Sequence, residues 1–358
     1  MALFNKNNFL SSDETVFRNI NAFDYKFVPK VIPHREKQQF KIVACINPLF
    51  QKRDGRNLVI SGLPGIGKTV LLKHIIRELE EESDDVIPIY INCWQKNTPY
   101  KIYLEICEQF DFKFTQNKRT EELLEVIKKL LNTKSAVFIF DEIDKAEDTS
   151  FLYSLIEEIF YKTIICITNF KNWISDLDDR VLSRLVPERM EFLPYNKEEI
   201  KDILNERQKI GFYNPISDDS LLQKIIEKTF DAKDIRTGLY LLKESGLNAE
   251  ERSSNVIEAQ DVDNALNKLV DFKIKDIDEL DDDSKLILTL IKQNSPSKIG
   301  AIFKIYESKK GRLSYKSFQR RVSKLEENHF IMAKKQMGGS EGTTTILSYQ
   351  TNMTLNDF

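Results

Sequence analysis

The chain has 358 residues, of which 41% are hydrophobic and 30% are charged, and its formal net charge is −3 at pH 7. This length suits two or three domains, and the near-neutral balance excludes nucleic-acid binding through bulk charge alone. The longest apolar runs are strand-sized, so we expect no membrane span and no membrane partner, and the first residues lack the apolar core of a secretory signal. Four widely spaced cysteines favour buried free thiols in a reducing cytoplasm.

The first half of the chain alternates short apolar runs with amphipathic segments. Runs such as 136–140 (AVFIF) are continuous and apolar, which is typical of strands buried on both faces. The segments between them repeat their apolar residues at helical spacing. This alternation predicts a parallel sheet covered by helices on both faces. We expect strands at 57–62, 86–92, 136–140 and 163–168, and helices at 69–82, from Thr98-Pro99 onward, at 121–131 and at 151–161.

The pattern changes after Pro194, where helical spacing continues without strand patterns. A strongly acidic stretch at 271–283 reads as a solvated connector. Three further helices and two short strands around 338–342 then follow, which is the order of a winged helix, a relative of the helix-turn-helix. We expect domains at 1–195, 196–270 and 271–358. The helices are expected at 196–209, 219–230, 234–245, 259–269, 284–293, 297–308 and 314–328.

A phosphate-binding motif joins the first strand to the first amphipathic helix. Residues 62–69 read GLPGIGKT and match G-x-x-x-x-G-K-[ST]. Its glycines let successive amides face phosphate oxygens, and the helix that begins there presents its positive dipole end. Lys68 would reach the β and γ phosphates, and the Thr69 hydroxyl would bind Mg²⁺. We expect ATP or ADP to contact Gly62, Pro64, Gly65, Ile66, Gly67, Lys68, Thr69 and Val70.

Acidic residues follow the 136–140 strand. Asp141 is a candidate magnesium ligand, and Glu142 is a candidate general base for the attacking water. The alternative is a pair of acids that cap a helix. Asn169 follows the 163–168 strand and would position the water, although an asparagine there can also be only a turn residue.

These motifs together resemble the AAA+ ATPases, and within them the archaeal replication initiators, which are similar to origin recognition complex subunit one and cell division control protein six. The likeness covers about 27–349. It rests on the phosphate loop, on FDEID at 140–144, on Asn169 at the sensor-one position, on DDRVLSRL at 178–185 and on DIRTGL at 234–239. It implies an AAA+ base with a parallel sheet, a helical lid and a C-terminal winged helix.

The resemblance also assigns roles to arginines. Arg236 would reach the γ-phosphate from the lid, and Arg184 would enter a neighbouring subunit's site, with Arg180 as the second candidate. For each arginine the alternative is a surface salt bridge. We further expect Val28, Tyr195 and Arg207 to contact the nucleotide.

The C-terminal segment concentrates basic charge. Ten Lys and Arg residues but three acids lie in 304–335. In the 314–328 helix the apolar Phe318, Val322 and Leu325 fix one face inward, so we expect the basic residues to face outward toward duplex DNA. A merely solvated helix is the alternative. The expected DNA contacts are Lys316, Arg320, Arg321 and Lys324, with Lys334 and Lys335 in the wing.

A second DNA contact is expected in the base domain. Initiators of the resembled family insert an element between the second strand and the acidic motif, and 112–119 (FKFTQNKR) occupies that place. Lys113, Lys118 and Arg119 would meet phosphates, while Phe112 and Phe114 could instead belong to the core.

The resemblance therefore implies a slow ATPase that binds double-stranded origin DNA and helps recruit the replicative helicase. It implies a location in the cytoplasm at the nucleoid, with other initiator subunits as further candidate partners. Two rivals share the motifs. One is a clamp-loader-like or branch-migration ATPase, and the other is a nucleotide-switched transcription or plasmid-maintenance regulator.

Overall fold

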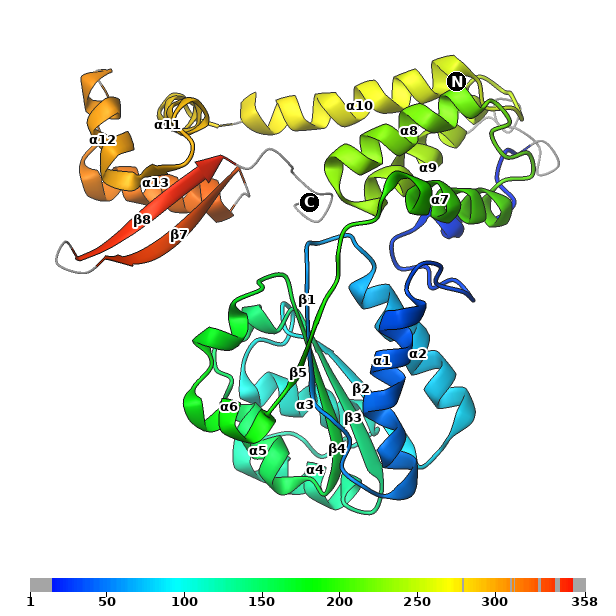
Figure 1. Cartoon of the computed structure of the whole chain (residues 1–358), viewed down its shortest axis with the longest axis vertical. Helices are drawn as coiled ribbons and strands as arrows, with labels where there is room; N and C mark the ends of the chain where they lie inside the picture. The colour runs from blue at the N-terminus through cyan, green and yellow to red at the C-terminus, as the bar shows by residue number, and fades with distance from the viewer. Residues whose placement is uncertain are drawn as a thin grey trace. The chain divides into compact units, whose positions relative to one another are not determined.

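The computed structural model describes residues 15–278, 280–309, 311, 313–327, 330–338 and 342–349, with backbone alone for 270–278, 327, 334–338, 342 and 343. Two compact units make up this part of the chain. One lies within Asn21–Arg207, and the other combines the preceding residues with those from Gln208 onward. Figure 1 colours both units along the chain.

The first unit contains a five-stranded sheet with the strand order β2-β3-β4-β1-β5. Every neighbouring pair is parallel, and the register places Asn92 opposite Asp141 and Ser61 opposite Thr168. The carboxyl ends of β1, β3 and β4 therefore meet at one edge, where open parallel sheets bind their ligands. The strands are β1 (Leu58–Ser61), β2 (Val86–Asn92), β3 (Ser135–Asp141), β4 (Tyr161–Thr168) and β5 (Glu188–Glu191).

Helices cover both faces of this sheet (Figure 1). On one face, α1 and α2 pack their apolar residues against the strands. On the other face, α3 to α6 form the larger core. The helices are α1 (Glu36–Ile46), α2 (Lys68–Glu82), α3 (Pro99–Gln109), α4 (Thr120–Leu131), α5 (Ser150–Glu158) and α6 (Asp179–Leu185), with short 3-10 helices at Ile20–Phe23, Asn47–Gln51, Ile143–Lys145 and Trp173–Asp176.

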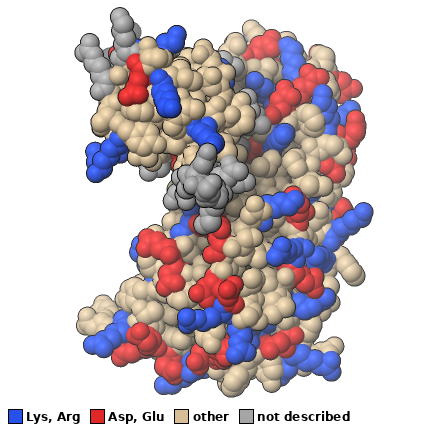
Figure 2. Space-filling model, turned by 60° about the vertical axis from the view of Figure 1, so that its left-hand side comes forward, with Lys and Arg blue, Asp and Glu red and all other residues tan. Residues whose placement is uncertain are grey.

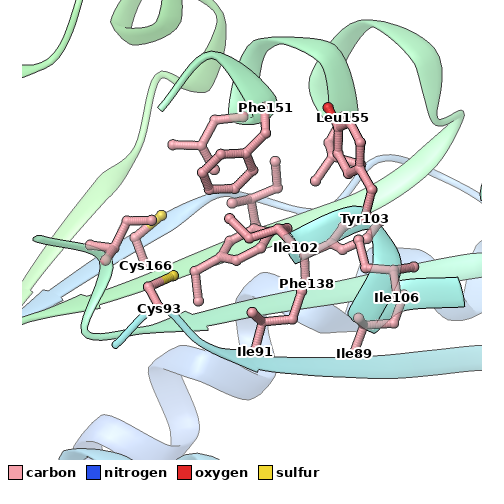
Figure 3. Close-up of a cluster of buried hydrophobic side chains, with 14 of the residues drawn as sticks. Ile89, Ile91, Cys93, Ile102, Tyr103, Ile106, Phe138, Phe151, Leu155 and Cys166 are labelled. Carbon is pink, nitrogen blue, oxygen red and sulfur yellow. The ribbon is translucent and has the colours of Figure 1, made fainter. Parts of the chain in front are cut away.

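The larger core lies directly behind the acidic motif. Figure 3 shows Phe138 of β3 surrounded by side chains from β2, α3 and α5. Phe140 and Phe151 meet edge to face with ring centroids 4.9 Å apart, a favourable aromatic geometry. All four cysteines are buried free thiols, as expected. This packing fixes the end of β3, from which Asp141 and Glu142 project.

The second unit begins with helices. Helix α7 (Lys197–Gly211) leads into it, followed by α8 (Asp219–Ala232), α9 (Ile235–Glu251) and α10 (Ala259–Asp278). Asp218 and Asp234 cap α8 and α9 by accepting backbone hydrogen bonds from Ser220 and Arg236. Among the described helices none is both long and apolar enough to cross a membrane.

The last part of this unit is a module at 280–349. It comprises α11 (Asp282–Gln293), β6 (Ser297–Lys298), α12 (Ile299–Ser308), α13 (Tyr315–Glu327), β7 (Ile331–Gly338) and β8 (Gly342–Tyr349). Its three strands form an antiparallel sheet in the order β6-β8-β7. The helices and the sheet share one apolar core, which includes Ile302, Tyr306 and Phe318. The three helices and the strand pair β7 and β8 follow the order that the sequence predicts. Strand β6 was not expected: Ser297 and Lys298 pair with β8, and the helix expected at 297–308 begins at Ile299.

Several predicted boundaries were wrong. The helix expected at 151–161 ends at Glu158, because Tyr161 already pairs with Ser135 as the first residue of β4. The connector expected at 271–283 is largely helical, since α10 continues to Asp278 and α11 begins at Asp282. The acidic composition therefore led to a wrong prediction of a connector where α10 continues. The side chains of α10 from residue 270 onward lie outside the described part of the structure.

Candidate functional site

The phosphate loop has a backbone that only glycine adopts readily. Gly62, Gly65 and Gly67 have φ values of 153°, 68° and 91°, in the region that side chains disfavour. Gly67 immediately precedes α2, so the first amides of that helix face the loop. The loop thus presents backbone amides and the positive end of a helix dipole, as a phosphate site requires.

Lys68 lies at the centre of this loop and is buried. Its ammonium donates hydrogen bonds to the carbonyl oxygens of Gly62 and Leu63, at 2.8 and 2.7 Å. It also donates to the side-chain oxygen of Asn169, at 2.9 Å. The cation is therefore held against the loop, and phosphate oxygens would replace some of these three acceptors as partners of the ammonium.

Thr69 and Asp141 lie together as the sequence predicts. The Thr69 hydroxyl donates to Oδ2 of Asp141 at 2.7 Å. The hydroxyl of Tyr90 on β2 donates to the same carboxylate oxygen at 2.7 Å. Burial, followed by the charge of Asp141, raises the pKa of Tyr90, so this phenol stays a donor. The resulting cluster of oxygen atoms has the donor chemistry that Mg²⁺ prefers.

Glu142 follows Asp141 in a left-handed backbone conformation, with φ at 55°. Its pKa is raised, first by burial and then by the charges of Asp141 and Asp144. Lys145 and a hydrogen bond with Asn92 oppose this rise. A carboxylate with a raised pKa is a stronger base, which suits abstraction of a proton from water near neutral pH.

Asn169 is fixed at the end of β4. Its backbone amide donates to Oδ1 of Asp144 at 3.4 Å, and the Thr168 hydroxyl donates to the same oxygen at 2.8 Å. Its side chain accepts from Lys68. The structure thus brings together the predicted Lys68, Thr69, Asp141, Glu142 and Asn169, and the turn-residue alternative does not account for the contact between Asn169 and Lys68.

The other expected nucleotide contacts lie in differing surroundings. The carbonyl of Val28 accepts a hydrogen bond from Arg77 at 3.4 Å. Tyr195 is buried against the phosphate loop, where its hydroxyl would lie 2.5 Å from a Cβ placed on Gly67. Arg207 is buried, donates to the carbonyl of Ala22 at 3.2 Å and lies over the Phe27 ring, and burial lowers its pKa to about 10.

The arginines assigned by resemblance are also placed. Arg184 is 57% exposed and pairs with Glu157, with an N–O distance of 3.1 Å. Arg180 is exposed and forms no ion pair with any residue in the described ranges. Arg236 belongs to the second unit, in the first turn of α9, where its Nε lies 4.0 Å from Asp234. In this structure Arg184 therefore forms the surface salt bridge that was the alternative to a role in a neighbouring subunit's site.

Helix α13 carries a basic stripe, defined here as Lys316, Arg320 and Lys324. These three residues are exposed and follow one another at four-residue spacing, which places them on one helix face. Phe318, Val322 and Leu325 are buried on the opposite face. The prediction of an outward basic face is correct for the stripe.

Arg321 departs from that prediction. It lies at the border between the stripe and the core, is only 35% exposed, and forms an ion pair with Asp281. Its position one residue after Arg320 turns it about 100° round the helix, toward α11. The side chains of Lys334 and Lys335 lie outside the described residues.

The segment expected as a second DNA contact is a loop between α3 and α4. Lys113 and Arg119 are exposed and Lys118 is partly buried. Phe112 packs on the core, whereas Phe114 is 80% exposed. Figure 2 shows basic and acidic side chains intermixed over the lower part of the visible face, so charge alone does not single out one region there.

Three contacts at this site were missed from the sequence. Tyr90 and Asn92 lie on the same side of β2 and contact Asp141 and Glu142, respectively. Their two-residue spacing next to an acidic motif was the available signal. Arg35 was not among the expected contacts, yet its guanidinium donates to the loop carbonyl of Ile66 at 2.9 Å. A buried arginine leaves no periodic signature, so helical or strand spacing does not mark it.

Comparison with known proteins decides the family. A family model described as an AAA domain matches residues 51–168, and a model described as a Cdc6 AAA+ ATPase-type lid domain matches residues 201–267. The ORC1-type DNA replication protein 1 of Sulfolobus acidocaldarius is 32% identical over 358 residues, covering 93% of this chain and 90% of that protein. The chain belongs to the ORC1-type DNA replication proteins. It is accordingly an AAA+ ATPase with a nucleotide-binding site and a lid domain.

Further relatives of this ORC1-type protein agree. The ORC1-type DNA replication protein 1 of Sulfurisphaera tokodaii is 32% identical over 334 residues, covering 88% of this chain and 84% of that protein. Among solved structures, the Aeropyrum pernix ORC1 protein in complex with DNA matches with a TM-score of 0.70 and 24% identity, covering 95% of this chain and 94% of that one. This last likeness shows the fold alone.

Proposed function

We propose that this ORC1-type protein is an ATP-regulated initiator that binds double-stranded origin DNA and helps recruit the replicative helicase. The observation that carries the proposal is the hydrogen-bonded set Lys68–Asn169 and Thr69–Asp141 at one sheet edge. It occurs in a chain whose described C-terminal module presents a separate basic stripe on α13. Nucleotide binding and the α13 contact with duplex DNA would thus belong to different units of one chain.

In the nucleotide site, the glycine-rich loop and Lys68 would hold the phosphates. Thr69 and Asp141 would hold Mg²⁺, because a hydroxyl and a carboxylate oxygen 2.7 Å apart are suitable donors for that ion. The ion supplies positive charge that offsets the charge of the phosphates. Arg236 would approach the γ-phosphate from the lid and so register which nucleotide is bound.

Hydrolysis would use Glu142 as the general base, with Asn169 orienting the attacking water. Arg184 would act on the site of a neighbouring subunit, which requires that it leave Glu157. Exchange of one exposed ion pair costs little, since such pairs contribute at most about 1 kcal/mol. Arg180, which has no such partner in the described ranges, is the second candidate. A requirement for a neighbour would make turnover by isolated subunits slow.

Duplex DNA would be bound by the basic stripe of α13, with the hairpin of β7 and β8 reaching the backbone beside it. Three cations at four-residue spacing on one exposed helix face suit phosphates that flank a groove. Arg321 is left out of this contact because Asp281 already engages it. A merely solvated helix remains the rival interpretation, and the salt dependence of binding separates the two.

The loop between α3 and α4 is proposed as a second DNA contact. Its exposed Phe114 and the cations Lys113 and Arg119 combine an apolar tip with positive charge. Apolar side chains inserted beside phosphate-binding cations are a recurrent way to distort a duplex. Two contacts from one chain would let the protein bend origin DNA in the cytoplasm, where other initiator subunits could assemble on it.

Genome-wide occupancy of the protein is the test of this function. Binding concentrated at replication origins, lost with Lys316→Ala/Arg320→Ala/Lys324→Ala, is expected. Binding confined to promoters would overturn the initiator proposal in favour of a nucleotide-switched regulator. Turnover that rises steeply with DNA, together with closed ring assembly, would instead favour a branch-migration or clamp-loader-like ATPase.

A further inference from the structure

A short segment at 192–195 lies along the phosphate loop. The amide of Phe192 donates to the carbonyl of Ser61 at 2.8 Å. A Cβ on Gly62 would lie 2.6 Å from the Phe192 carbonyl oxygen, and a Cβ on Gly67 would lie 2.5 Å from the Tyr195 hydroxyl. These two glycines are thus required by close approach as well as by backbone conformation. The segment leads directly into α7, which begins at Lys197.

Arg35 joins the loop to this segment. One guanidinium nitrogen, Nη2, donates to the carbonyl oxygens of Ile66 and Leu193, both at 2.9 Å. The guanidinium also lies 3.9 Å from the centroid of the Tyr195 ring. Arg35 therefore contacts the loop between its second and third glycines, and it contacts the segment at Phe192, Leu193 and Tyr195.

The environment of Arg35 is unusual for a cation. Only 4% of the residue is exposed, and it forms no ion pair within the described ranges. Its Nε is buried without a hydrogen-bond partner in the described part of the chain. Carbonyl oxygens and ring faces offset the cost of burying a charge only in part. If packing were the only requirement, burying an apolar residue of similar volume here would cost less free energy than burying an arginine.

We propose that Arg35 is a positioning residue of the nucleotide site, which holds the Ile66 peptide so that the phosphate loop and the segment 192–195 move as one body. The inference rests on the proposed nucleotide site and adds a residue that lies outside the phosphate loop, the acidic motif and the sensor position. Because the segment continues into α7, a change in the loop on nucleotide binding would reach the start of the lid through Arg35.

The test compares Arg35→Lys and Arg35→Met with Lys37→Ala in the full chain. Lys37 is an exposed cation two residues away and serves as the matched control. A lysine keeps the charge but lacks the planar group that bridges two carbonyls and stacks on a ring. We expect both Arg35 variants to bind ADP roughly ten- to hundredfold more weakly, as when other residues that orient ligands are removed. Lys37→Ala should bind like the unaltered chain.

Equilibrium titration of folded protein separates this role from a merely structural one. If the Arg35 variants lower the melting temperature but bind ADP within twofold of the unaltered chain, the inference is overturned. Lys68→Ala, measured in parallel, separates a failure of the role proposed for Arg35 from a failure of the proposed nucleotide site. Should Lys68→Ala lose ADP while the Arg35 variants keep it, only the role of Arg35 fails; should Lys68→Ala also keep ADP, the nucleotide site itself fails.

Hydrogen exchange in the unaltered chain keeps the inference testable even if the variants do not fold. ADP should slow amide exchange in the phosphate loop and at Leu193 and Tyr195 together. Protection confined to the loop would show that the loop and the segment respond separately, which contradicts the proposal.

Discussion

The ammonium of Lys68 and the side-chain oxygen of Asn169 are 2.9 Å apart, which ties the start of α2 to the end of β4. This contact spans two parallel strands that are direct neighbours in the sheet, because β1 pairs with β4. The pairing register of β1 with β4 therefore fixes the position of the phosphate loop relative to Asn169. A displacement of either would be transmitted to the other.

Replacing Asn169 with Ala should separate binding from hydrolysis. The loop amides and Lys68 remain, so ATP affinity should stay within a few-fold of the unaltered chain. Hydrolysis should fall about a hundredfold, since a positioned polar group at a reacting centre is worth roughly that factor. Single-turnover assays with radiolabelled ATP measure both quantities. Lys171→Ala, an exposed neighbour on the same loop, is the control and should leave both unchanged.

Glu142→Gln should abolish most hydrolysis and retain ATP binding. A general base contributes about a hundred- to ten-thousandfold. The base must be ionised to act, so activity is lost as pH falls through its pKa. Because burial and neighbouring acids raise the pKa of Glu142, the unaltered chain should lose activity at a higher pH than an ordinary glutamate would dictate. A pH–rate profile whose acid limb stays at the ordinary value would argue against Glu142 as the base.

An arginine that acts between subunits predicts complementation. Glu142→Gln protein lacks its own base but offers Arg184, whereas Arg184→Ala protein keeps its base but offers no arginine. Each should be nearly inactive alone, and a mixture should recover part of the ATPase activity. The same mixing experiment with Arg180→Ala tests the second candidate. Activity that is strictly additive for both mixtures would exclude action in trans by either residue.

Helix α13 offers a matched comparison of neighbouring arginines. Arg320→Ala should reduce the slope of log affinity for duplex DNA against log salt by about 1, because one phosphate contact is lost. Arg321→Ala should change the slope much less. It should instead lower the stability of the C-terminal module by at most about 1 kcal/mol, since its ion pair with Asp281 is partly exposed. Equal slopes for the two variants would move the DNA contact away from the stripe.

The sheet and the phosphate site could be predicted because their signals are local. The strand predicted at 86–92 has the same bounds in the structure. The GLPGIGKT motif predicts phosphate binding from its residues alone. Short elements were missed for a physical reason. β5 (ERME) is an edge strand with one buried residue, so it lacks an apolar run, and α6 has only seven residues. Such elements are stabilised by their neighbours in the fold.

Contacts between segments that are distant in the sequence could not be predicted either. The pair Arg321–Asp281 spans 40 residues, and Arg35 meets Leu193 across 158. Helical spacing predicts that Arg320 faces outward, but it does not predict that Asp281 lies beside Arg321. Neither contact follows from periodicity, because the partner is chosen by packing between elements rather than within one.

The central claim is that the loop at 62–69 binds nucleotide through Lys68. Equilibrium titration with ATP and ADP, comparing the unaltered chain with Lys68→Ala in the presence and absence of Mg²⁺, tests it most directly. We predict one nucleotide per chain, tighter with Mg²⁺, and loss of measurable binding in the variant while the fold is retained. Undiminished affinity in a folded Lys68→Ala protein would contradict the account.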